Sequence, residues 1–118
     1  MMENKQGKLL KIYLGESDKY KGKSLYKYIL ELVKKEGMAG ATIFRGMEGF
    51  GRTSVIHSTS ILRFSTDLPI LIEIVDLQEK IDHVKELILE VMHDEKLTGG
   101  LITEEKVNIL FYNGIGSS

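Results

Sequence analysis

The feature of this sequence that most limits its fold is the order in which two hydrophobic periodicities follow one another along 118 residues. Apolar residues recur three and four positions apart over residues 25–33 and 77–91, which indicates two amphipathic helices. Extended stretches with the alternation or apolar content of strands surround these helices, at residues 8–14, 41–45, 69–75 and 107–111. The predicted order is therefore strand, helix, strand, strand, helix, strand.

Local signals mark where the two helices begin and end. Ser24 offers an N-cap to the first helix, and Gly37 supplies the left-handed residue that stops it. Asp76 and Glu79 have the spacing of a capping box in its acidic form, which predicts that the second helix opens there. The run Thr98-Gly99-Gly100 ends this helix and leads to the last strand.

Six elements in this order usually fold as an α+β, ferredoxin-like βαββαβ domain. Its four strands form one antiparallel sheet in the spatial order 4-1-3-2, with both helices on one face. This topology brings three connections to the same end of the sheet, at residues 15–23, from residue 46 onward and at residues 98–100. The second face, with Leu9, Phe44 and Leu71 among its apolar candidates, needs another cover, which favours association of identical chains.

Composition limits the functions that this chain can have. Its length fits one domain over residues 1–118, with residues 1–7 and 114–118 expected to be flexible. A formal net charge of -1 provides no field that would hold nucleic acid or an anionic membrane, and the absence of cysteine excludes disulfides and thiolate chemistry. Three scattered histidines predict no metal site, and no apolar run is long enough to span a bilayer. We therefore expect a cytoplasmic protein that recognises its partners locally.

One motif just past the second strand points to a ligand. Gly49-Phe50-Gly51-Arg52 combines two glycines, an aromatic ring and a guanidinium at the base of a long loop. Glycine lets backbone N–H groups approach an anion closely, and arginine offers a planar fork that suits phosphate or carboxylate. The simpler alternative is that these glycines and Gly46 only let the chain leave a strand and turn. The gathering of the glycine-containing connections at one end of the sheet strengthens the phosphate-site hypothesis, and both alternatives stay open at this point.

The same motif resembles the base of the T-loop in PII-type nitrogen-signalling proteins, and the predicted topology agrees with that family. Ile72-Glu73-Ile74-Val75 and Thr98-Gly99 also resemble PII segments, the latter like the opening of the B-loop that meets nucleotide phosphates. The longer pattern from Gly37 to Thr42, followed by Arg45-Gly46, is similar to an uncharacterised branch of PII-like proteins. The resemblance covers most of the chain and implies a homotrimeric regulatory protein. It also implies adenine nucleotides in clefts between subunits, no catalysis and no obligatory cofactor.

On this resemblance, the nucleotide is expected to meet the base of the loop and the segment around the last strand. The residues implied are Arg45, Gly46, Gly49, Phe50, Gly51, Arg52, Thr98, Gly99, Gly100 and Lys106.

The sequence also departs from the PII pattern. No tyrosine lies between Gly51 and Pro69, which excludes uridylylation at a tyrosine there, and no arginine or lysine follows Lys106. With fewer cations available, AMP or ADP is favoured over ATP as the ligand. We expect the loop over residues 51–60 to be mobile and to contact a target protein or transporter.

Other functions share this order of strands and helices. An RNA-recognition motif would need aromatic side chains on a central strand, whereas the glycine motif lies in a loop and the chain is not basic. An acylphosphatase would need an arginine in the first loop, which instead contains Lys19, Lys21 and Lys23. An amino-acid-binding ACT domain also places ligands between subunits and stays an alternative, although the motif favours a PII-like protein.

Overall fold

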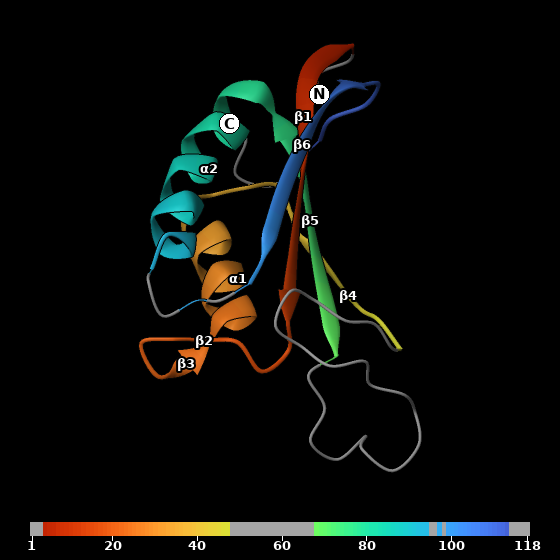
Figure 1. Ribbon diagram of the computed structural model, residues 1–118. Coiled ribbons are helices and arrows are strands. Elements are labelled where there is room, and N and C mark those ends of the chain that lie inside the picture. Colours follow the sequence, from red (N-terminus) through yellow and green to blue (C-terminus); the bar gives the residue numbers. More distant parts are fainter. Residues whose placement is uncertain (1–3, 48–67, 95–96, 98, 114–118) are drawn as a thin grey trace.

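The computed structural model describes residues 4–47, 68–94, 97 and 99–113, which are built around a four-stranded antiparallel sheet (Figure 1). The strands lie in the order β4-β5-β1-β6. Their bounds are Lys5–Gly15 for β1, Thr42–Arg45 for β4, Pro69–Leu77 for β5 and Leu101–Ile109 for β6. Read from β6, this is the order 4-1-3-2 of a ferredoxin-like sheet, so the predicted α+β fold is confirmed.

Both helices cover the same face of the sheet (Figure 1). They are α1 (Leu25–Lys35) and α2 (Gln78–Met92), and each turns an aliphatic stripe toward alternate residues of β1 and β5. The side chains that meet there are fully buried: Leu10, Ile12, Ile72, Ile74, Leu25, Ile29, Ile81, Val84 and Ile88. Neither helix in the described part of the chain is long and apolar enough to cross a membrane.

Four charged side chains pair α2 with the neighbouring strands β1 and β6. Lys8 on β1 lies 2.6 Å from Asp82 on α2, and Lys85 on α2 lies 3.0 Å from Glu104 on β6. The hydrogen bond from Lys8 lowers the pKa of Asp82, and the hydrogen bond from Lys85 lowers the pKa of Glu104. Because both pKa values are lowered, the pairing stabilises the fold above about pH 4 and is lost as the pH falls through these values.

The last strand begins six residues earlier than its hydrophobic pattern indicates. The pattern predicts a strand over residues 107–111, but β6 already begins at Leu101 and ends at Ile109. The run from Thr103 to Lys106 is polar because an edge strand exposes most of its side chains to solvent, so apolar alternation does not reveal it. At the other terminus, β1 begins at Lys5 and takes in residues 5–7 of the segment expected to be flexible.

A short hairpin replaces the loop that the sequence predicts after β1. It consists of β2 (Lys19–Tyr20) and β3 (Lys23–Ser24), joined by Lys21 and Gly22. The two turn residues have φ values of 50° and 80°, the left-handed conformation that a two-residue hairpin turn requires. The strands are too short to give a periodic pattern in the sequence.

The helix ends follow the prediction at one place and depart from it at another. Gly37 has φ of 77° and ends α1, as predicted. Asp76, in contrast, does not open a capping box, because it lies inside β5 and Leu77 is the residue that caps α2. Its side chain instead accepts hydrogen bonds from three segments of the chain.

Asp76 is fully buried, and three hydrogen bonds satisfy its carboxylate. It accepts them from the N–H of Ala39 at 2.8 Å, the N–H of Leu77 at 2.7 Å and the hydroxyl of Tyr112 at 2.7 Å. Burial, followed by the hydrogen bond to Asp76, raises the pKa of Tyr112 to about 12. This carboxylate therefore joins the α1–β4 connection, the start of α2 and the C-terminal segment.

Gly7 has no room for a side chain, which gives a test of the packing between β1 and its neighbours. A Cβ there would lie 2.8 Å from the backbone oxygen of Asp76 and 2.4 Å from Cδ1 of Ile109. We expect Gly7→Ala to lower the free energy of unfolding by about 1–3 kcal/mol, measured by urea denaturation. Gly40→Ala is the matched control, since no described atom would lie within 4 Å of a Cβ at that position. Equal stability of both variants would contradict this packing.

Tyr112→Phe tests the buried carboxylate. The variant removes a hydrogen bond to a charged group, and we expect it to lower the free energy of unfolding by about 1–3 kcal/mol near neutral pH. The folded-state pKa of Tyr112 is raised to about 12, so the contribution of its hydroxyl is complete below about pH 10 and disappears as the pH rises toward 12. Urea denaturation at pH 8 and pH 11 should therefore show a smaller difference from the wild type at the higher pH. Tyr13→Phe, at a half-exposed position, should show no such trend.

Candidate functional site

The connections predicted to gather at one end of the sheet do so. Gly15 at the end of β1 pairs with Pro69 at the start of β5, and Arg45 at the end of β4 pairs with Ile70. Leu101 at the start of β6 pairs with Tyr13, near the same end of β1. We call residues 15–16, 45–46, 68–69 and 99–100 the rim.

The two parts of the rim that were predicted to meet phosphate lie on opposite edges of the sheet. Arg45 and Gly46 follow the edge strand β4, whereas Gly99 and Gly100 precede the other edge strand β6. Three strand spacings separate these edges, roughly 14 Å. One phosphate group therefore cannot contact both parts within a single chain, and a site that uses both parts needs a second subunit.

On the β4 side, Arg45 is accessible but already has a partner. Its Nη2 lies 2.5 Å from Oε2 of Glu16, and 53% of its side chain is exposed. An anion that binds this guanidinium must compete with the carboxylate. Gly46 next to it has a packing role, because its N–H donates to the oxygen of Pro69 at 2.8 Å and a Cβ would lie 2.6 Å from the Pro69 ring.

On the β6 side, the two glycines differ in what they require. Gly100 has φ of 120°, and a Cβ there would lie 2.6 Å from Cε of Met92, so backbone conformation and packing both explain it. Gly99 has no positive φ, and no described atom lies within 4 Å of a Cβ built on it. Packing against the described residues therefore gives no reason for glycine at position 99, and the space where its side chain would lie is open on that side.

Lys106 lies apart from the rim of its own chain. It is on β6 opposite Lys8, whereas the rim begins beyond Leu14 on the neighbouring β1. Six residues of extended strand separate those two positions, roughly 20 Å. Five other predicted residues lie outside the described part of the chain, as does the loop over residues 51–60: Gly49, Phe50, Gly51, Arg52 and Thr98.

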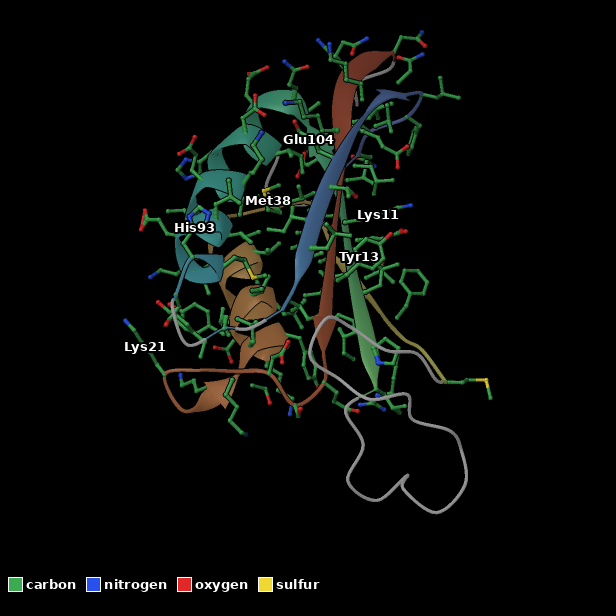
Figure 2. All side chains as sticks on the ribbon, viewed as in Figure 1. Lys11, Tyr13, Lys21, Met38, His93 and Glu104 are labelled. Atoms are coloured by element: carbon green, nitrogen blue, oxygen red, sulfur yellow. The ribbon has the colours of Figure 1, made fainter. Side chains whose placement is uncertain are left out.

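Beside the rim, four apolar side chains cross the uncovered face of the sheet in one row. Strand pairing aligns Phe44 with Leu71, Leu71 with Tyr13, and Tyr13 with Leu101. Phe44 is 48% exposed, Tyr13 39% and Leu101 57%. Figure 2 shows Tyr13 on the side of the sheet that faces away from the helices. We call these four residues the apolar row.

The sequence contains parts of this row but does not reveal the row itself. It places Phe44 and Leu71 on the second face, but it gives no link between them and Tyr13, and Leu101 falls outside the predicted last strand. Only the strand register reveals that the four align, since alternation gives the face of a residue but not its neighbour on the next strand. The next row is polar and includes Lys11, which lies 3.7 Å from Glu105 (Figure 2).

Metal binding finds no support in this part of the molecule. Within residues 4–47, 68–94, 97 and 99–113, no three His, Cys, Asp or Glu side chains gather closely enough to hold a metal ion. The rim instead presents the exposed guanidinium of Arg45, whereas the N–H groups of Gly15, Glu16 and Gly46 already donate hydrogen bonds within the chain.

A family model and a curated relative both match most of this chain. Residues 7–109 match the model of the DUF190 family, which is described as "Uncharacterized ACR". A UPF0166 protein of Methanocaldococcus jannaschii is 41% identical over 92 residues, which is 78% of this chain and 84% of the relative.

Solved structures with the same fold include PII-like proteins. CPII of Thiomonas intermedia K12, a nitrogen regulatory PII-like protein bound to ADP, AMP and bicarbonate, superposes with a TM-score of 0.67 at 17% identity, covering 94% of each chain. The GlnK–ATP complex of B. subtilis has a TM-score of 0.57 at 18% identity and covers 91% of this chain and 85% of GlnK. At these identities the structures establish the shared fold.

Proposed function

Because this chain belongs to the DUF190 family and has the fold of PII-like proteins, we propose that it is a regulatory protein that binds an adenine nucleotide between its subunits. The role proposed is that of a sensor without catalysis and without an obligatory cofactor. The observation that supports the proposal is the rim, whose two parts, predicted to meet phosphate, lie at one end of the sheet but on opposite edges.

Association of identical chains would complete such a site. The apolar row leaves Phe44, Tyr13 and Leu101 exposed, and a neighbouring subunit that covers them removes this surface from water. Phe44 directly precedes Arg45, and Leu101 directly follows Gly100. A contact along the row therefore brings the rim of one subunit close to its neighbour. We propose the homotrimer that the PII resemblance implies.

The proposed ligand is AMP or ADP, with its phosphates at the rim. Gly99 offers an open approach to the backbone, and Arg45 offers an accessible guanidinium. The pairing of Arg45 with Glu16 and the distance of Lys106 from the rim leave few cations for a triphosphate. CPII, whose structure is known with ADP and AMP, supports this preference, while the GlnK complex contains ATP and is the reason to compare all three nucleotides.

Arg52 and the loop over residues 51–60 complete the proposal. Arg52 would add a second guanidinium to the phosphate site, and the loop would carry the signal to a target protein or transporter. Both remain predictions from the sequence.

Calorimetric titration with AMP, ADP and ATP tests the nucleotide site. We expect Arg52→Ala to weaken nucleotide binding roughly ten- to a hundredfold, because one charge-assisted hydrogen-bonding group is lost. Gly99→Ala should weaken binding without changing the melting temperature, since its methyl group meets no described atom. Gly40→Ala, an equally open glycine in the connection between α1 and β4, is the control and should bind as the wild type does. If none of the three nucleotides binds the wild type at millimolar concentration, the sensor proposal is wrong and an ACT-like ligand becomes the better hypothesis.

Sedimentation equilibrium tests the assembly. We expect the wild type to sediment as a trimer at micromolar concentration, and Phe44→Ser with Leu101→Ser to shift it toward the monomer because both side chains are exposed in the single chain. Leu110→Ser is the control, since Leu110 is 68% exposed but lies beyond the other end of β6. A wild-type protein that stays monomeric would remove both the trimer and the site between subunits.

A further inference from the structure

We propose that the β2–β3 hairpin and the first turns of α1 form a docking surface for an acidic peptide segment of a partner protein. This basic surface consists of Lys19, Lys21, Lys23 and Lys27; the Tyr20 ring lies beneath Lys21 and the Tyr26 ring beneath Lys27. It is separate from the apolar row and does not depend on nucleotide binding.

The four lysines carry charge that the described residues do not neutralise. All four are exposed, and none forms an ion pair within the described part of the chain, in contrast to Lys8 and its carboxylate partners. The first turn of α1 contains no acidic residue.

Acidic side chains near the hairpin are engaged elsewhere. The carboxylate of Glu16 pairs with Arg45, and that of Asp18 accepts a hydrogen bond from the N–H of Gly15 at 2.9 Å. Asp18 keeps its negative charge, so the four lysines leave an excess of positive charge at this surface for an acidic partner.

The hairpin is held in a defined conformation before any partner binds. The rings of Tyr20 and Tyr28 pack edge to face with centroids 4.7 Å apart, which fixes β2 to α1. Lys21 has φ of 50°, a conformation that a residue with a side chain adopts at an energetic cost, and its Nζ lies 5.3 Å from the centre of the Tyr20 ring. A surface that is already ordered loses less entropy when a peptide binds.

An acidic peptide fits this surface better than nucleic acid or a membrane does. Tyr20 and Tyr28 are half-buried and packed against each other, so they offer no free ring on which a base could stack. The large apolar side chains that are exposed in the described chain lie elsewhere, so the hairpin has nothing to insert into a bilayer. Lysine ammonium groups bind carboxylates as point charges and need no planar alignment.

The position of the hairpin suits a partner that responds to the state of the protein. Figure 1 shows it at the same end of the molecule as the ends of β1 and β4, where the rim lies. In Figure 2, Lys21 extends away from the body of the protein. A peptide bound there would lie next to the rim without covering the apolar row.

Fluorescence anisotropy with a labelled oligoglutamate peptide at low ionic strength tests the proposal. We expect Lys21→Glu with Lys23→Glu to weaken binding by about tenfold or more, because two attractions become repulsions. The matched control is Lys34→Glu with Lys35→Glu, which changes the net charge equally at the other end of α1 and should bind within about twofold of the wild type.

A second variant separates loss of charge from loss of structure. Lys21→Asn removes the charge but favours the left-handed turn conformation, so it should bind the peptide more weakly while melting no lower than the wild type. The proposal is wrong if the wild type does not bind the peptide, or if the control variant loses as much affinity. It is also wrong if phosphatidylserine vesicles or single-stranded DNA bind as tightly with the same dependence on Lys21 and Lys23. Nucleotide titration is an independent measurement, so either proposal can fail alone.

Discussion

A carboxylate in an aliphatic core must find its hydrogen bonds inside the protein, and here Asp76 accepts three. The donors come from Ala39, Leu77 and Tyr112, which belong to three segments far apart in the sequence. The carboxylate thus fixes where α2 starts, holds the connection that precedes β4 and anchors the C-terminal segment. Ala39 precedes the edge strand β4 and Tyr112 follows the edge strand β6, so one buried carboxylate ties both edge strands together at the end of the sheet opposite the rim.

Because side chains alternate along each strand, one face of the sheet packs against the helices and the other face is left uncovered. On the covered face, isoleucines and leucines of β1 and β5 meet the helices and are fully buried. On the other face, the strand register gathers Phe44, Leu71, Tyr13 and Leu101 at the end nearest the rim, and a polar row with Lys11 follows. Among the described residues, exposed apolar side chains occur at both ends of the sheet, and those of the apolar row lie beside the glycines and Arg45, where an interface would contribute directly to a ligand site.

The order of elements could be predicted from the sequence, because helix and strand periods differ and Gly37 marks a helix end by its backbone conformation. Features that depend on tertiary contacts could not be predicted from the sequence. Asp76 looks like a helix cap by spacing but serves buried donors, and the polar edge strand β6 looks like a loop. For the site, the predicted strand order 4-1-3-2 already places Arg45 and Gly99 at one end of the sheet and on opposite edges, and the structure has this order. The pairing of Arg45 with Glu16 depends on tertiary contacts and could not be predicted.

The adjacency of the apolar row and the rim has a thermodynamic consequence. Phe44 and Arg45 are consecutive, as are Gly100 and Leu101, so a ligand shared between two chains and the contact that joins these chains would use neighbouring residues of the same two strands. Ligand affinity and self-association are then linked functions: each ligand molecule bound strengthens the assembly, and the apparent dissociation constant falls as protein concentration rises. In such a system the abundance of the protein itself sets the range of ligand concentrations to which it responds.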